Sequence, residues 1–167
     1  KRLPIIDVIF LAAFYVYRFI VGGVVSFTPL SPWLFVFAAF FFLSLGIAKR
    51  YAELLIVSDR GEAISHGRGY QAEDGGLLLI FGINAAFLAL LVFMLYFQSP
   101  DIYRLYQAPW FLWGVFLLIG YWLMRLWLLV HRRVVHDDPL IFTLKDRVSW
   151  MVGMVSFALI LFASWYG

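Results

Sequence analysis

The chain has 167 residues, of which 64% are hydrophobic, 20% aromatic and only 14% charged, and its formal net charge is +3. A soluble domain is closer to half apolar and a quarter charged, so this composition indicates an integral membrane protein. The absence of cysteine excludes disulfides and thiolate metal sites. The small positive charge does not indicate nucleic-acid binding, because its distribution relative to a membrane matters more than its sum.

Five apolar stretches predict membrane-spanning helices, since a span needs about 20 mostly apolar residues. They cover residues 5–25, 32–48, 76–97, 108–130 and 148–166. The second is short for a span, and the apolar residues 54–57 predict that its helix continues past the membrane interface. Turns are expected at 26–32, which contains two prolines, and at 98–109. No repeat or linker is found, so residues 1–167 are predicted to form one all-α transmembrane domain.

The chain starts at Lys1 with an apolar run close behind, and no signal-peptide cleavage pattern follows. We therefore expect this sequence to be the C-terminal part of a longer chain.

Basic residues predict the orientation in the membrane. Ten of them fall on one side if the 49–74 loop is cytoplasmic, whereas only Arg104 falls outside. The ten are Lys1, Arg2, Lys49, Arg50, Arg60, Arg68, Arg132, Arg133, Lys145 and Arg147. This asymmetry predicts a cytoplasmic N-terminus, cytoplasmic polar loops and an external C-terminus, in what we expect to be a bacterial inner membrane.

Charged residues within spans are costly and usually face protein or water. Arg18 is expected to extend its side chain to the outer headgroups, and Asp7 to pair with a cytoplasmic cation or to lie at the interface. Arg125 lies about two turns from the inner end of its helix. It either reaches a cytoplasmic site or extends to the lipid headgroups.

The polar loop from residue 49 to 74 is where chemistry is expected. Lys49 and Glu53 are four residues apart and share a helix face, so they form either an anchoring ion pair or, together with Arg50, a phosphate and metal site. Arg68 and Tyr70 precede two carboxylates at the start of the third span. Those carboxylates, Glu73 and Asp74, either favour the helix N-terminus or bind Mg²⁺.

A second polar segment, residues 131–147, is predicted to lie on the same side. The spacing of His131 and His136 does not favour a transition-metal site. Asp137 and Asp138 are better explained as part of a magnesium or phosphate network. Asp146 is expected to cap the last helix.

Three segments together resemble the polyprenyl-phosphate phosphoribosyltransferase-like branch of the UbiA-type membrane prenyltransferases. They are Pro4 to Val8 with Tyr17-Arg18 and Gly22-Gly23, Lys49 to Leu54, and His136 to Pro139 followed by Leu144 to Ser149. The resemblance covers the whole chain in order. It corresponds to helices five to nine of a nine-helix fold.

The resemblance implies a Mg²⁺-dependent transferase acting on a polyprenyl lipid and a diphosphate-activated donor, by prenyl or phosphoribosyl transfer. It assigns catalytic roles to Lys49, Arg50 and Glu53, and substrate contacts to Arg68, Tyr70, Arg125, Asp137 and Asp138. Magnesium is expected at Glu53, Glu73 and Asp74. Lys49 and Glu53 fall where relatives carry their second aspartate-rich motif, with lysine in place of the first aspartate.

The family's first metal loop, of the Asn-Asp-x-x-Asp type, is absent from these residues. The isolated chain is therefore expected to be inactive without an N-terminal half or other membrane subunits. The alternative is a non-catalytic subunit of a larger membrane complex that binds lipid or pigment. A third interpretation, a transporter, is not favoured because the sequence shows neither internal repeats nor interrupted helices.

Overall fold

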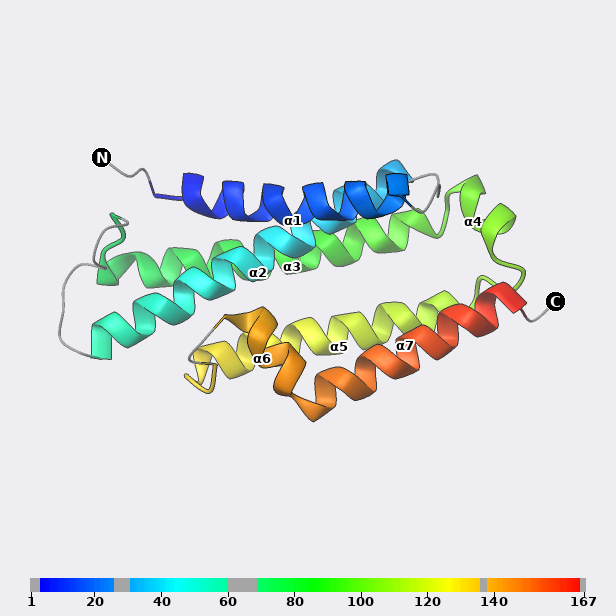
Figure 1. Ribbon diagram of the computed structural model, residues 1–167. Coiled ribbons are helices and arrows are strands. Elements are labelled where there is room, and N and C mark those ends of the chain that lie inside the picture. Colours follow the sequence, from blue (N-terminus) through cyan, green and yellow to red (C-terminus); the bar gives the residue numbers. More distant parts are fainter. Residues whose placement is uncertain (1–3, 26–30, 60–68, 136–137, 166–167) are drawn as a thin grey trace.

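Five long helices dominate the computed structural model, which describes residues 4–25, 31–59, 69–135 and 138–165 (Figure 1). They are α1 (Ile6–Val25), α2 (Pro32–Asp59), α3 (Gly75–Tyr96), α5 (Phe111–His131) and α7 (Arg147–Trp165). Each is long and apolar enough to cross a membrane. The predicted class is therefore confirmed: the chain is an all-α integral membrane protein.

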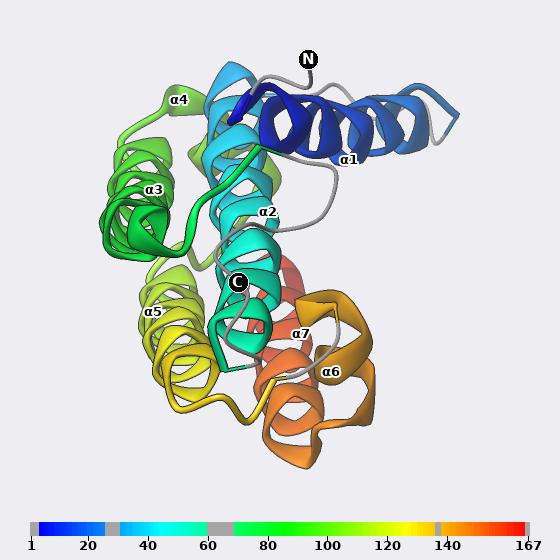
Figure 2. The same cartoon turned by 90° about the vertical axis from the view of Figure 1, so that its left-hand side faces the viewer.

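Helix α2 is the central element of the bundle. It packs against α1, α3, α5 and α6, and in an end-on view the other helices are arranged around it (Figure 2). Its 28 residues span about 42 Å, which exceeds the hydrocarbon core of about 30 Å. The predicted continuation of this helix through residues 54–57 is confirmed, and the C-terminal part of the helix carries Lys49, Arg50 and Glu53.

The two predicted polar segments lie at the same end of the bundle. The C-terminal ends of α2 and α5 and the N-terminal ends of α1 and α3 meet there, close to α6 (Figure 1). The opposite end holds α4 and the C-terminal end of α7. Side chains from distant parts of the chain therefore come together at one end.

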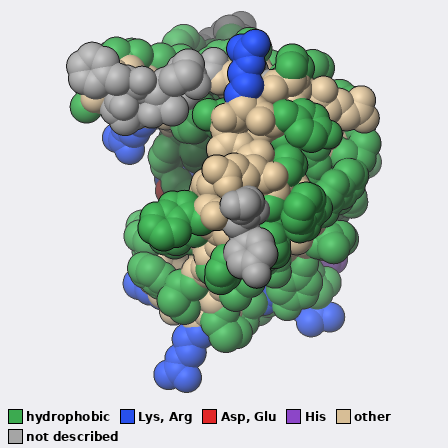
Figure 3. Space-filling view, turned by 90° about the vertical axis from the view of Figure 1, so that its right-hand side faces the viewer, with side chains coloured by type: hydrophobic (Ala, Val, Ile, Leu, Met, Phe, Trp, Pro, Cys, Tyr) green, Lys and Arg blue, Asp and Glu red, His purple; other side chains and the backbone are tan. Residues whose placement is uncertain are grey.

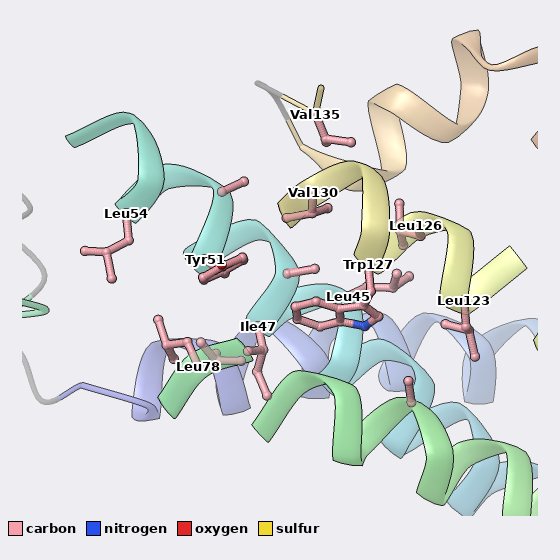
Figure 4. Close-up of a cluster of buried hydrophobic side chains, with 14 of the residues drawn as sticks. Leu45, Ile47, Tyr51, Leu54, Leu78, Leu123, Leu126, Trp127, Val130 and Val135 are labelled. Atoms are coloured by element: carbon pink, nitrogen blue, oxygen red, sulfur yellow. The ribbon is translucent and has the colours of Figure 1, made fainter. Parts of the chain in front are cut away.

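A buried junction fixes α5 against α2 and α3. The Trp127 indole N–H donates to Ser44 Oγ at 3.0 Å, and Ser44 Oγ donates to the Gly82 carbonyl at 2.8 Å. Figure 4 shows Trp127 among apolar side chains that include Ile47 and Leu126. Each polar atom of the junction has a partner, which removes the desolvation cost of burying it in apolar surroundings.

The outer surface is strongly apolar. Viewed from the α4 end, hydrophobic side chains cover most of the visible surface (Figure 3). Large side chains such as Phe14, Leu117, Phe157 and Trp165 are more than 60% exposed. A soluble protein does not expose this much apolar area, so the surface is consistent with contact with lipid or other membrane helices.

Three short helical segments were not predicted. They are η1 (Ala72–Asp74), α4 (Pro100–Leu105) and α6 (Pro139–Lys145). The start of α6 has a physical cause, because the Asp138 carboxylate accepts a hydrogen bond from the Leu140 N–H and Pro139 occupies the first turn. Segments of three to seven residues are too short to show a helical period in the sequence.

Candidate functional site

A group of charged side chains surrounds Arg50 at the polar end of the bundle. Arg50 Nε donates to Asp7 Oδ2 at 2.5 Å, and Nη1 donates to Glu53 Oε2 at 2.7 Å. The Arg50 side chain is only 9% exposed. A cation this buried requires opposite charges, and α1 and α2 each supply one. Of the two alternatives for Asp7, the structure shows pairing with a cation, which is Arg50.

Tyr70 connects this group to the segment before α3. Its hydroxyl donates to Asp7 Oδ1 at 2.8 Å and accepts from the backbone N–H of Ile5 at 2.7 Å. Burial, reinforced by the neighbouring Asp7 charge, raises the pKa of Tyr70 to about 12, although the Ile5 N–H and Arg50 act in the opposite direction. Tyr70 is therefore a neutral donor that holds Asp7 in place. We refer to Asp7, Arg50, Glu53 and Tyr70 as the Arg50 cluster.

Lys49 does not pair with Glu53, its neighbour four residues along the same helix. Its ammonium group pairs with Asp138 Oδ2 at 2.6 Å, whereas the i,i+3 partner of Glu53 is Arg50. The other oxygen of Asp138 caps α6, so this one carboxylate joins α2 to the start of α6. The expected Lys49–Glu53 pair is replaced because a long side chain at the end of α2 can reach across to α6.

Arg125 forms a two-pronged ion pair with Asp146. Its Nη1 and Nη2 atoms donate to Asp146 at 2.7 and 3.0 Å. Asp146 also accepts from the backbone N–H and the hydroxyl of Ser149, so the predicted cap of α7 is confirmed. Partial burial acts to raise the pKa of Asp146, but the hydrogen bonds from Arg125 and Ser149 outweigh it and lower that pKa below its ordinary value. Neither predicted environment of Arg125 included this partner.

The remaining predicted residues are less closely assembled. Glu73 is exposed in η1, and the Asp74 carboxylate accepts from the Gln71 N–H at 2.8 Å. Arg68 and Asp137 lie outside the described residues. Among the residues that the structure describes, no group of three or more histidine or acidic side chains is close enough to hold a metal ion. The expected set Glu53, Glu73 and Asp74 is thus not gathered into one group.

The Arg50 cluster nevertheless offers carboxylate ligands of the kind that Mg²⁺ binds. Asp7 and Glu53 both bond to the Arg50 guanidinium, so two carboxylates lie close to a single point. Magnesium is commonly held by one or two carboxylates together with substrate phosphates. The residues present match that donor set, provided that phosphate oxygens supply the remaining ligands.

The fold and the charged groups together define a polytopic helical membrane protein with paired cations and carboxylates at one end of its bundle. No protein-family model matches the chain. The chain is 36% identical over 154 residues, 92% of its length, to the uncharacterized protein y4nM of Sinorhizobium fredii. It is 26% identical over 146 residues, 87% of its length, to the nodulation protein NoeC of Azorhizobium caulinodans.

A shorter similarity connects the chain with a named enzyme. It is 36% identical over 64 residues, 38% of its length, to the decaprenyl-phosphate phosphoribosyltransferase of Corynebacterium glutamicum, a UbiA-type protein. The chain spans 30% of y4nM, 47% of NoeC and 19% of the phosphoribosyltransferase. The predicted relationship is therefore supported as partial homology to a UbiA-type membrane phosphoribosyltransferase.

Proposed function

We propose that this bundle forms part of the active site of a Mg²⁺-dependent UbiA-type membrane transferase, which moves a group from a diphosphate-activated donor to a polyprenyl lipid. The single observation that carries the proposal is the Arg50 cluster, in which one buried cation contacts two carboxylates at the polar end of the bundle. The partial similarity to decaprenyl-phosphate phosphoribosyltransferase favours a phosphoribosyl donor and a polyprenyl phosphate acceptor.

In this proposal, the ion pairs at the polar end exchange partners when donor binds. Lys49 and Arg50 turn from carboxylates to diphosphate oxygens, because a guanidinium or ammonium binds phosphate through charge-assisted hydrogen bonds. Glu53 and Asp7 then become available to orient the metal, while the Tyr70 hydroxyl holds Asp7 in position. Before donor binds, the same pairing keeps the buried Arg50 charge compensated.

The reaction breaks the bond between the donor carbon and the diphosphate, and both bonding electrons remain on the diphosphate. The polyprenyl acceptor supplies the electron pair of the new bond. Lys49 and Arg50 stabilise the negative charge that develops on the departing diphosphate. Bound Mg²⁺ would supply further neutralisation of that charge.

Other residues complete the proposed site from neighbouring segments. Arg68 and Asp137 are assigned donor contacts by the sequence resemblance alone. Asp138 positions Lys49 through their ion pair. Arg125, through its ion pair with Asp146, forms one side of the proposed substrate site. Other membrane helices, from an N-terminal half or from separate subunits, would supply the remaining metal ligands.

We also propose the orientation of the bundle, with its polar end on the cytoplasmic side of a bacterial inner membrane. The basic residues Lys49, Arg50, Arg132, Arg133, Lys145 and Arg147 support it, because basic residues accumulate in cytoplasmic segments. A cytoplasmic site would have direct access to a water-soluble phosphorylated donor.

The test compares Lys49→Ala with Lys145→Ala, which removes an exposed cation from α6 at the same end. Because the isolated chain is expected to be inactive, transfer is measured on the full-length protein in membranes, with a labelled diphosphate-activated phosphoribosyl donor and decaprenyl phosphate. A lost charge-assisted contact is worth about 1.5–3 kcal/mol, so Lys49→Ala should weaken donor binding by about ten- to hundredfold. Lys145→Ala should leave donor binding unchanged.

Glu53→Gln adds a metal-specific readout. It keeps the size of the side chain but removes the negative charge, so the Mg²⁺ concentration for half-maximal transfer should rise. Unchanged donor affinity for Lys49→Ala, at normal protein levels, would exclude Lys49 from the donor site. That result would favour the alternative of a lipid- or pigment-binding accessory subunit.

A further inference from the structure

An apolar groove runs between α3 and α5, with a volume of about 370 Å³. Its walls are formed by α3 side chains from Leu79 to Leu90 and by α5 side chains from Leu123 to His131. The α3 wall extends about 16 Å along the helix axis, at a rise of 1.5 Å per residue. The lining is almost entirely aliphatic and aromatic, which suits a hydrocarbon chain.

The groove has one polar end, at His131. The His131 imidazole Nδ1 and the Tyr51 hydroxyl are hydrogen-bonded at 2.9 Å. Two exposed arginines, Arg132 and Arg133, follow directly after His131. A hydrocarbon-lined groove thus ends at a cationic, hydrogen-bonding mouth.

The backbone at this mouth holds Arg133 in a conformation that normally requires glycine. The Arg133 N–H bonds to the Val130 carbonyl and the Val134 N–H to the Leu129 carbonyl, which is the Schellman pattern at a helix C-terminus. Arg133 has a φ of 60°, the left-handed region in which a side chain is strained. Glycine would close this helix with less strain, so the arginine indicates a role for the side chain itself.

The groove is separate from the Arg50 cluster. Tyr51 is one residue after Arg50, so the two side chains point about 100° apart around α2. Arg50 contacts Asp7 of α1, whereas Tyr51 contacts His131 of α5. End-on, α3 and α5 lie on one side of α2, and α1 and α6 lie on the other (Figure 2).

We propose that this groove binds one anionic phospholipid of the surrounding membrane, with an acyl chain between α3 and α5 and the phosphate at His131, Arg132 and Arg133. The argument is complementarity of both parts: an apolar slot for the chain, and a cationic mouth at headgroup level for the phosphate. A neutral phospholipid would use the slot but gain little from the two arginines. The inference is independent of the proposed transferase activity.

The test uses purified, delipidated protein, with dioleoyl phosphatidylglycerol or dioleoyl phosphatidylcholine added in a non-ionic detergent. Native mass spectrometry counts the bound lipids, and thermal unfolding reports the stabilisation. We expect one tightly retained phosphatidylglycerol that raises the unfolding temperature, and at least fivefold weaker binding of phosphatidylcholine, given the contribution of one juxtamembrane cation.

Arg133→Gly is the informative variant because glycine suits the left-handed backbone. Without lipid, its unfolding temperature should equal or exceed that of the wild type. With phosphatidylglycerol, binding should weaken roughly fivefold, and Arg133→Lys should restore most of it. Lys145→Ala, at the same end but on α6, should bind phosphatidylglycerol like the wild type.

Three results would overturn the proposal. Equal binding of the two phospholipids would show that the groove holds lipid without regard to charge. Equal binding of inorganic phosphate or of glycerophosphoglycerol would show that the apolar groove contributes nothing. Unchanged phosphatidylglycerol affinity in Arg133→Gly would show that this side chain does not contact the headgroup.

Discussion

Gly82 in α3 lies against the ring of Trp127, and its replacement tests the packing that holds α5 to the rest of the bundle. A methyl group at this position would lie 2.1 and 2.2 Å from Trp127 Cη2 and Cζ2, and 3.0 Å from Ile47 Cγ2. The indole cannot easily withdraw, because its N–H is bonded to Ser44. Gly82→Ala must therefore displace Trp127 or separate α3 from α5.

Three contributions determine how much Gly82→Ala changes the free energy of unfolding. Overpacking costs about 1–3 kcal/mol, and loss of the Trp127–Ser44 hydrogen bond costs about 1 kcal/mol. Alanine recovers about 1 kcal/mol through its higher helix propensity. We therefore expect Gly82→Ala to lower the free energy of unfolding by about 1–3 kcal/mol.

The assay is reversible unfolding in mixed detergent micelles, followed by circular dichroism and tryptophan fluorescence. Gly76→Ala is the matched control, because it lies in the same helix and a methyl group there meets no atom within 4 Å. It should be neutral or slightly stabilising. In a Trp127→Phe background, which removes the clashing ring edge, the cost of Gly82→Ala should fall by at least about 1 kcal/mol. Equal stability of Gly82→Ala and Gly76→Ala would refute the packing argument.

Three further predictions concern the side chains of Asp146 and Tyr70. Asp146→Asn keeps a capping side chain but removes the charge that pairs with Arg125, so the free energy of unfolding should fall by about 1–3 kcal/mol in chemical denaturation. The folded state lowers the pKa of Asp146, so the charged carboxylate contributes stability at pH values above its ordinary pKa of 3.8. This contribution is lost as the pH falls through the lower pKa of the folded state. Unfolding of the wild type and of Asp146→Asn, compared between pH 2 and 6, should show this loss. Tyr70→Phe should remove a stabilising contribution that is present below pH 10 and lost as pH rises towards about 12, measured as the difference in stability between variant and wild type across that range.

Orientation gives a prediction that depends on neither stability nor activity. The chain has no cysteine, so single cysteines can be introduced without background. Lys145→Cys should react with a membrane-impermeant maleimide only from the cytoplasmic side. Tyr103→Cys, which replaces a side chain of α4 that is 73% exposed, should react only from outside. The opposite labelling pattern would reverse the proposed topology and place the polar end away from the cytoplasm.

The five spans could be predicted from the sequence because each is a mostly apolar run of nearly the length that a membrane requires. The polar extension of α2 was also predictable, because apolar residues 54–57 continue the helix beyond Lys49 and Arg50. The helices α4 and α6 were not, since six or seven residues carry no clear period. Their formation depends on local features such as the Asp138 cap.

The partners of the charged residues were predicted less well than the residues themselves. Spacing along one helix identified Glu53 as the neighbour of Lys49, but the structure gives Lys49 the carboxylate of Asp138, 89 residues later. Arg125 was noted as a charge within a span, yet Asp146 was considered only as a cap. Pairing between helices depends on how each helix is rotated and how far it extends, and a single sequence does not specify either.

The central claim is that the Arg50 cluster receives a diphosphate and a divalent metal. It is tested most directly by a structure of the protein determined with a diphosphate-activated donor and Mn²⁺ in place of Mg²⁺, using anomalous scattering to locate the metal. The account predicts a metal peak within coordination distance of the Asp7 or Glu53 carboxylate, with diphosphate oxygens hydrogen-bonded to Lys49 or Arg50. Donor and metal bound elsewhere, with Arg50 still paired to Asp7 and Glu53, would contradict it.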